Sequence, residues 1–337
     1  MRAYNSGMKR IIYAAVLALA LCIAPAFSAS TTQPVAASEW SAKFFAYDAP
    51  KELIVEQATP TPEQVEWRAR PRQLEKDAAE PAKTKVAAKP RALGALDIIH
   101  IRFKDARGEV VPALLCTPRG MAGPFPLVVA VHGLTSNKAQ VCAQVAPELI
   151  RRGFAVLAPD MPFHGERPGE PRMLMNRDDP QRTLKTYQQS ILDVRQAIDA
   201  AFTLPQIDSK HGVVLAGYSM GSFIDSVAGP ADERVKAMVL MVGGAPDLGG
   251  MAALIPQLIM VDPAIAIAHF AHPVLLLNAR NDQIVTPDMG KRLFAAAVEP
   301  KKQIWYDSGH ILPRSAYEDA AEWVATTWKE MMEQKQP

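Results

Sequence analysis

Residues 213–223 read VVLAGYSMGSF, in which an apolar run leads directly into a serine spaced between two glycines. A reactive serine at the top of a sheet needs a strand-to-helix corner so tight that its flanking residues must be small. Gly217 and Gly221 meet that need on either side of Ser219. The stretch therefore predicts a buried strand, a sharp turn at Ser219 and a helix over 221–228. It makes Ser219 a candidate nucleophile rather than an ordinary turn serine.

Outward from this corner, strand-like and helix-like segments alternate from residue 95 onward, as in an α/β fold with a mostly parallel sheet. The first two strands are separated by KDARG and are typical of an antiparallel pair, whereas the later ones are apolar runs typical of buried parallel strands. Strands are predicted at 95–103, 109–118, 126–133, 153–160, 211–219, 234–244, 272–282 and 302–310. Helices are predicted at 138–152, 183–204, 221–228, 286–298 and 316–333.

A base is the next requirement, because a serine hydroxyl is a weak nucleophile at neutral pH and usually needs a histidine oriented by a carboxylate. Of the 7 histidines, His310 follows the last predicted strand in the loop DSGH, at the same edge of the sheet as Ser219. His132 and His164 follow other strands at that edge, and we expect them to support loops or line a pocket. His310 is therefore the predicted base.

The acid is predicted to be Asp282, which closes the strand just before the one that delivers His310. The order Ser219, Asp282, His310 is the nucleophile, acid, base order of one large hydrolase fold. Asp247, after the preceding strand, is the alternative acid, and Asp307 lies too near His310 in sequence to orient it.

Acyl transfer also needs backbone donors for the oxyanion. We expect one from the amide of Met220, at the start of the helix after Ser219, where amide groups are unpaired and the helix dipole is positive. The second is expected from Leu134, after the His-Gly pair that ends the third strand.

The N-terminus is typical of a secretory signal peptide over residues 1–28, with a basic head, an apolar run of about 14 residues and then small residues. That run is too short for a stable membrane span. Leu21 precedes Cys22, which argues against a lipid anchor. We therefore expect an exported protein, periplasmic or secreted, with an Ala/Pro/charged arm over 29–94 and one catalytic domain over 95–337. The aromatic residues within 39–48 are expected to dock on that domain.

The chain has 337 residues and a formal net charge of +2, which gives no indication of a nucleic-acid partner. Cys116 and Cys142 remain after the leader, and the sequence allows either a disulfide or two separate buried thiols. No His/Cys cluster has metal-ligand spacing, so neither a metal nor a cofactor is expected. The sequence leaves the oligomeric state open.

Five motifs carry a resemblance to a known superfamily. They are HGLTSN, APDMPFHGERPG, AGYSMGS, NARNDQIV and DSGH, spread in that order over residues 132–310. Residues 95–333 resemble the α/β-hydrolase superfamily, and within it the dienelactone hydrolase, acetyl xylan esterase and prolyl oligopeptidase-type domains. The resemblance implies an eight-stranded, mostly parallel sheet flanked by helices. It departs from the dienelactone hydrolases proper, whose nucleophile is cysteine where this chain has Ser219.

The substrate is the least determined feature. The segment 245–271 is apolar and too short for a large cap domain. Met251 and Leu254 within it either line a pocket or simply cover the sheet. An apolar, lightly covered site favours a carboxylesterase acting on a small short-chain or aryl ester. A prolyl oligopeptidase-type peptidase and a catalytically silent binding scaffold are the alternatives.

Overall fold

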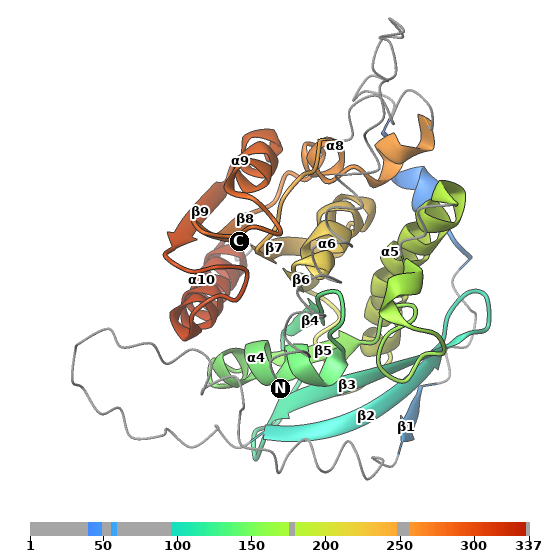
Figure 1. Ribbon diagram of the computed structural model, residues 1–337. Coiled ribbons are helices and arrows are strands. Elements are labelled where there is room, and N and C mark those ends of the chain that lie inside the picture. The colour runs from blue at the N-terminus through green and yellow to red at the C-terminus, as the bar shows by residue number, and fades with distance from the viewer. Residues whose placement is uncertain (1–39, 49–54, 59–95, 175–178, 248–255, 335–337) are drawn as a thin grey trace, which may run out of the picture.

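The computed structural model describes residues 40–48, 55–58, 96–174, 179–247 and 256–334. Its centre is a nine-stranded sheet in the order β1-β2-β3-β5-β4-β6-β7-β8-β9 (Figure 1). The strands are β1 (Glu56–Ala58), β2 (Leu96–Lys104), β3 (Val110–Pro118), β4 (Leu127–Val131), β5 (Ala155–Pro159), β6 (Val213–Tyr218), β7 (Val235–Met241), β8 (Val274–Ala279) and β9 (Lys301–Tyr306). All eight predicted strands are present.

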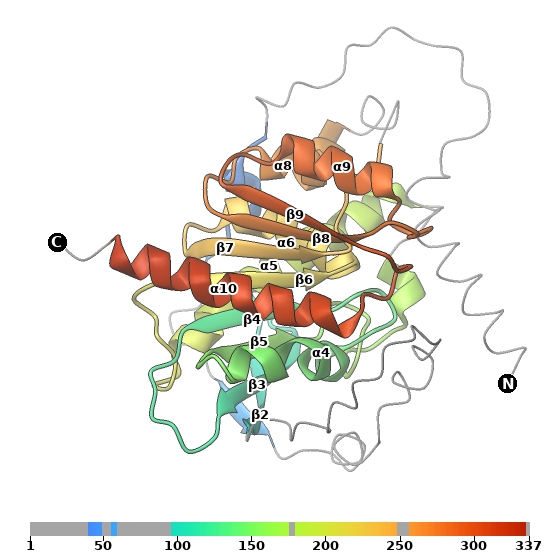
Figure 2. The ribbon, with the colours of Figure 1, turned by 90° about the vertical axis from the view of Figure 1, so that its left-hand side faces the viewer.

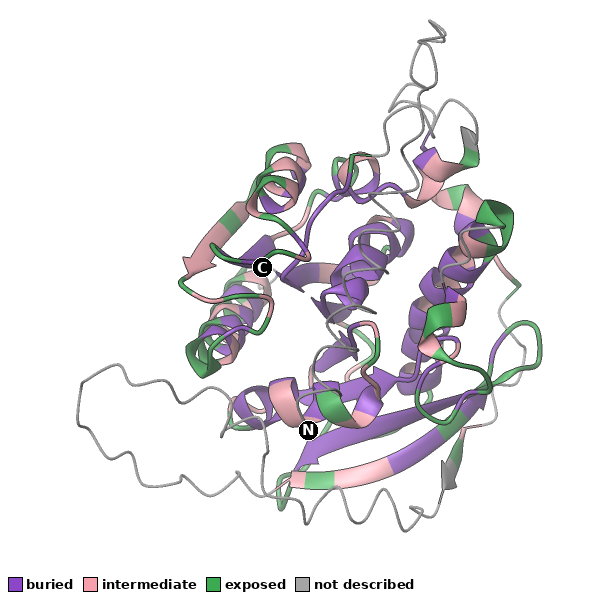
Figure 3. Ribbon diagram, viewed as in Figure 1, coloured by how far each residue is buried: buried purple, intermediate pink, exposed green. Residues whose placement is uncertain are grey.

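Pairing follows the predicted pattern. β2 and β3 form the antiparallel pair, and β5, β4, β6, β7, β8 and β9 are parallel to one another. The central strands β4, β5 and β6 are buried along their whole length, as Figure 3 shows in purple. Strands covered on both faces need apolar residues at every position, which explains their unbroken apolar runs.

Helices cover both faces of the sheet. α4 (Lys138–Ile150) and α10 (Arg314–Glu333) pack on one face, where α10 runs in front of the strands in Figure 2. α5 (Pro180–Phe202), α6 (Met220–Ala231), the short α8 (Pro263–Ile267) and α9 (Pro287–Ala296) pack on the other. Two short 3-10 helices, η3 (Pro171–Leu174) and η4 (Pro256–Val261), lie in connecting segments. Each face thus has its own apolar core. The C-terminal ends of the parallel strands all lie along the same end of the sheet, which is called the carboxyl edge below.

Part of the predicted arm belongs to the domain. β1 pairs antiparallel with β2 and forms an edge of the sheet, which adds a ninth strand that the sequence pattern did not predict. The short 3-10 helix η2 (Ala42–Phe45) fully buries Phe45, and Trp40 donates from Nε1 to the carbonyl of Met260 at 3.1 Å. Docking of the aromatic residues within 39–48 is therefore confirmed. The predicted leader, residues 1–28, lies outside the described residues and stays a prediction.

Cys116 on β3 and Cys142 on α4 are free thiols, each 1% exposed, with their sulfur atoms 3.6 Å apart. Of the two alternatives left open, the structure has the pair of buried thiols. Across the described ranges, no three His, Cys, Asp or Glu side chains gather as metal ligands. No helix in those ranges is both long and apolar enough to cross a membrane.

Candidate active site

Ser219 lies at the corner between β6 and α6, with φ 52° and ψ −112°. This strained backbone is held by close packing that only glycine allows on either side. A β-carbon at Gly217 would lie 2.4 Å from the carbonyl carbon of Gly221, and one at Gly221 would lie 2.1 Å from the oxygen of Val131. The spacing of the two glycines therefore follows from the geometry of the corner.

The side chains of Ser219, His310 and Asp282 form one hydrogen-bonded chain. The Oγ atom of Ser219 lies 2.9 Å from Nε2 of His310, and Nδ1 of His310 lies 2.8 Å from Oδ2 of Asp282. A carboxylate at Nδ1 fixes the tautomer, so Nδ1 donates to Asp282 and Nε2 accepts from the serine hydroxyl. The structure thus brings together the three predicted residues from three separate loops.

Asp282 is fixed from both sides of its carboxylate. Its second oxygen, Oδ1, accepts from the amides of Ile284 at 2.8 Å and Val285 at 3.1 Å, and the residue is 3% exposed. β8 and β9 are parallel neighbours, so the loops after them carry Asp282 and His310 to the same edge. A carboxylate with two amide donors needs no lysine or arginine to remain buried.

The two other carboxylates considered from the sequence, Asp247 and Asp307, lie away from His310. Asp247, the alternative acid, has a side chain that is 85% exposed and pairs with Arg292 at 3.3 Å. Asp307 is 87% exposed and pairs with Arg280 at 3.1 Å. The position beside His310 belongs to Asp282.

The predicted oxyanion donors lie on two segments that meet at the corner of Ser219. Met220 is the first residue of α6, where backbone amides have no partner within the helix. Leu134 follows Gly133, at which a β-carbon would lie 3.5 Å from the Ser219 β-carbon. The turn that holds Leu134 is closed by a bond from the Ser136 amide to the Gly133 carbonyl at 3.1 Å, with Thr135 at φ 65°. The loop after β4 therefore packs directly against the corner.

His132 is fully buried, so the expectation that it lines a pocket is wrong, whereas its expected support of the loop agrees with its bonds. Its Nε2 accepts from the amide of Met161 at 3.1 Å, which places the ring proton on Nδ1, 2.9 Å from the carbonyl of Gly133. Burial lowers the pKa of His132 to about 3. A neutral ring with both nitrogens bonded to backbone joins the loop after β4 to the loop after β5.

His164 is also inside the protein rather than on a pocket wall. It is 1% exposed, its Nδ1 lies 2.8 Å from the carbonyl of Pro162, and its ring centre is 4.9 Å from that of His132. Burial lowers the pKa of His164. Of the two roles expected for His164, its burial and its bond to the Pro162 carbonyl agree with the structural one. Met251 and Leu254, the other pocket candidates, lie outside the described residues.

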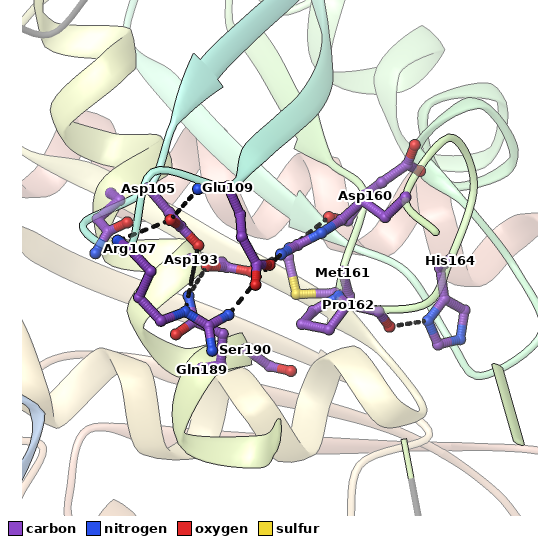
Figure 4. Close-up of polar contacts among 12 residues, drawn as sticks. Asp105, Arg107, Glu109, Asp160, Met161, Pro162, His164, Gln189, Ser190 and Asp193 are labelled. Atoms are coloured by element: carbon purple, nitrogen blue, oxygen red, sulfur yellow. Dashed lines mark hydrogen bonds and ion pairs between the residues drawn. The ribbon is translucent and has the colours of Figure 1, made fainter. Parts of the chain in front are cut away.

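Sequence reasoning missed a network of buried charges that holds the loop after β5, over residues 160–169 (Figure 4). Lys138 is almost fully buried and pairs with Asp160 and with Glu166, while Asp160 also accepts from the Lys138 amide at 2.9 Å. Arg167 pairs with buried Asp193 on α5 and reaches Glu109 at 2.9 Å.

Within this network, burial raises the pKa of Asp193 to about 6, although the ion pair with Arg167 acts to lower it. Gln189 extends the network from Asp193 to Asp105, which it contacts at 3.0 Å. Nothing in the sequence distinguishes Lys138, Arg167 and Asp193 from ordinary surface charges, because only the fold shows that they are buried.

Comparison with solved structures gives the same fold. An acetyl xylan esterase from Paenibacillus sp. R4 superposes with a TM-score of 0.58 at 18% identity, over 84% of this chain and 98% of that one. A cold-adapted esterase from an Arctic intertidal metagenomic library gives 0.55 at 20% identity, over 72% and 99%. A putative dienelactone hydrolase from Klebsiella pneumoniae subsp. pneumoniae MGH 78578 gives 0.53 at 18% identity, over 70% and 99%.

Comparison with characterised proteins finds a shorter match. Polyketide transferase ATR5 from Stachybotrys chlorohalonatus (strain IBT 40285) is 29% identical over 122 residues, which are 36% of this chain and 37% of that protein. Residues 128–332, which include Leu134, Ser219, Asp282 and His310, match the alpha/beta hydrolase family. The chain belongs to the alpha/beta hydrolase family.

Proposed function

We propose that this protein is a serine hydrolase of the carboxylesterase type, which cleaves small esters through an acyl-enzyme on Ser219. The observation that carries the proposal is the chain of hydrogen bonds from Ser219 through His310 to Asp282, at 2.9 Å and 2.8 Å. A hydroxyl, an imidazole and a buried carboxylate in this arrangement can activate a nucleophile without a metal or cofactor.

The reaction would run in two halves. Nε2 of His310 takes the proton of Ser219 as Oγ attacks the ester carbonyl, and the imidazolium that forms is stabilised by Asp282. The amides of Met220 and Leu134 would donate to the oxyanion. His310 then protonates the departing alcohol, which leaves an ester between Ser219 and the acyl group. Water, deprotonated by His310, attacks that ester, releases the carboxylic acid and restores the serine hydroxyl.

The ester assignment has support from two sides. The solved structures named above include two esterases of the same fold, and the described part of the chain places no large cap over the parallel strands. A peptidase of the prolyl oligopeptidase type is an alternative that the substrate panel described below distinguishes. A silent binding scaffold would have no need to keep the complete hydrogen-bonded chain.

Acyl transfer to an acceptor other than water is a variant of the same chemistry. The partial match to a polyketide transferase is the reason to test it. It would use the same acyl-enzyme, with an alcohol in place of water in the second half.

The test is a substrate panel assayed with the wild type and with Ser219→Ala, the control that lacks the proposed nucleophile. We expect hydrolysis of p-nitrophenyl acetate to exceed that of a long-chain p-nitrophenyl ester and of a prolyl peptide anilide. In Ser219→Ala, kcat should fall by about 10³-fold or more. Faster cleavage of the anilide would identify a peptidase, and an active Ser219→Ala variant would contradict the proposal. Formation of a new ester when an alcohol is added would identify a transferase.

A further inference from the structure

Tyr218, the residue before the nucleophile, makes two hydrogen bonds to the loop that carries His310. Its hydroxyl donates to the carbonyl of His310 at 2.8 Å and accepts from the amide of Leu312 at 3.2 Å. One hydroxyl on β6 is thus bonded to the backbone on both sides of Ile311, immediately after the histidine. The last residue of β6, next to Ser219, is thereby tied directly to the loop of the base.

We propose that Tyr218 is a positioning residue, whose hydroxyl fixes the His310 loop so that Nε2 of His310 stays within hydrogen-bond reach of Ser219. This inference rests on the proposed serine hydrolase function. Tyr218 touches no substrate atom in the proposal and acts only through His310.

The surroundings of Tyr218 suit this role. The residue is 7% exposed, and its ring stacks on Tyr317 of α10 with centroids 6.4 Å apart and planes 11° apart. It also meets the imidazole of His310 edge to face, at 6.2 Å. Burial raises the pKa of Tyr218 well above its ordinary value, so the hydroxyl keeps the proton that it donates. A packed ring with a satisfied hydroxyl is a rigid anchor.

The loop needs such an anchor because much of it lies at the surface. Gly309 is exposed and Ile311 is 61% exposed, so neither packs the loop against the core. Before the histidine, a backbone bond from the Asn281 amide to the Ser308 carbonyl at 3.0 Å also holds the loop. Leu312 is buried and follows the histidine. The Tyr218 hydroxyl holds the His310 and Leu312 backbone between these two points.

Loss of this anchor should affect catalysis more than substrate binding. A displacement of about 1 Å at a reacting group can lower a rate by roughly 10²-fold. Substrate contacts do not involve the Tyr218 hydroxyl in this proposal, so KM should stay nearly constant. Purely structural damage would instead lower the amount of folded protein, without a selective change in kcat.

The experiment compares Tyr218→Phe with the wild type and with Tyr47→Phe as a matched control. Tyr47→Phe also removes a hydrogen bond, the one from the Tyr47 hydroxyl to Asp199. Asp199 lies near the C-terminal end of α5, which leads into the start of β6, so this bond lies at the end of the sheet away from Ser219. In Tyr218→Phe we expect kcat for p-nitrophenyl acetate to fall by about 10- to 100-fold, with KM within about twofold of the wild type. Tyr47→Phe should keep both constants.

Two further readouts keep the outcome decisive. Labelling of Ser219 by a fluorophosphonate should slow in Tyr218→Phe by a factor similar to that for kcat. Hydrogen exchange at the Leu312 amide should speed up in Tyr218→Phe and not in Tyr47→Phe. Unchanged kcat and labelling in folded Tyr218→Phe would overturn the positioning role, and so would a rise in KM alone. A wild type that neither labels nor hydrolyses esters would instead overturn the proposed function, and the inference with it.

Discussion

Two loops at the carboxyl edge of the sheet each carry a histidine, and they are built in opposite ways. The loop after β9 is largely exposed, and His310 bonds through both ring nitrogens to side chains, those of Asp282 and Ser219. In the loop after β5, His164 is buried and bonds through Nδ1 to a backbone carbonyl. A network of buried charges holds that second loop.

The difference agrees with the separate roles that we propose for the two histidines. A base must gain and lose a proton during turnover, so its ring needs a carboxylate on one nitrogen and the nucleophile on the other. A ring bonded to backbone with a lowered pKa stays neutral and fixes geometry instead. Both loops begin at the end of a parallel strand, so strand order alone could not separate the two roles.

The largest stability effect is expected from breaking the charge network of the loop after β5. Arg167→Met removes the cationic partner of buried Asp193 and leaves Gln189, which is neutral, as its hydrogen-bond partner. The expected loss is about 3–5 kcal/mol in the free energy of unfolding, measured by urea titration. Arg119→Met is the control, because its pair with Asp97 is exposed and should contribute at most about 1 kcal/mol. Equal losses in the two variants would show that the network does not hold the loop.

A smaller effect is expected at Asp225, a buried carboxylate without the partners that Asp193 and Asp282 have. Asp225 is fully buried on α6, and within the described part of the chain neither of its carboxylate oxygens has a hydrogen-bond partner. It lies one helical turn from Gly221 and from Gly229, which both abut the sheet, so it occupies the same helix face. Burial raises its pKa well above the ordinary value.

This raised pKa gives a pH dependence of definite sign. The unfolded carboxyl ionises near pH 4, whereas the folded one resists ionisation, so this group costs stability progressively as pH rises above 4. Asp225→Asn cannot ionise, so its stability relative to the wild type should be greater at pH 7.5 than at pH 4. Urea titration of both proteins at both pH values measures this difference. A difference independent of pH would contradict an ionisable, unpartnered carboxylate.

The fold was largely predictable from the sequence because central parallel strands leave long apolar runs. β4, β6 and β8 read as such runs, and the glycines beside Ser219 indicate the corner between β6 and α6. The short β1 was not predictable, since Glu56–Ala58 becomes a strand only by pairing with the edge of β2. Its sequence has no apolar alternation of its own.

The candidate site was predictable where strand order fixes position, and not where burial decides the role. Ser219, Asp282 and His310 follow parallel strands that end at one edge, so their approach follows from topology. The roles of Tyr218 and Arg167 depend on tertiary partners far away in sequence, at His310 and Asp193. The sequence left His164 with either a structural or a pocket-lining role, because the depth of its ring cannot be predicted from the motif that contains it.

The most direct test of the account labels the wild type, His310→Ala and His164→Ala with a fluorophosphonate and maps the adduct by peptide mass spectrometry. The reagent forms a bond between the Ser219 oxygen and phosphorus with loss of fluoride, and it needs an activated serine. We predict an adduct on Ser219 in the wild type, labelling slowed by about 10³-fold or more in His310→Ala, and labelling within about tenfold of the wild type in folded His164→Ala. An unlabelled wild type, or folded His164→Ala that loses labelling while His310→Ala keeps it, would contradict the account.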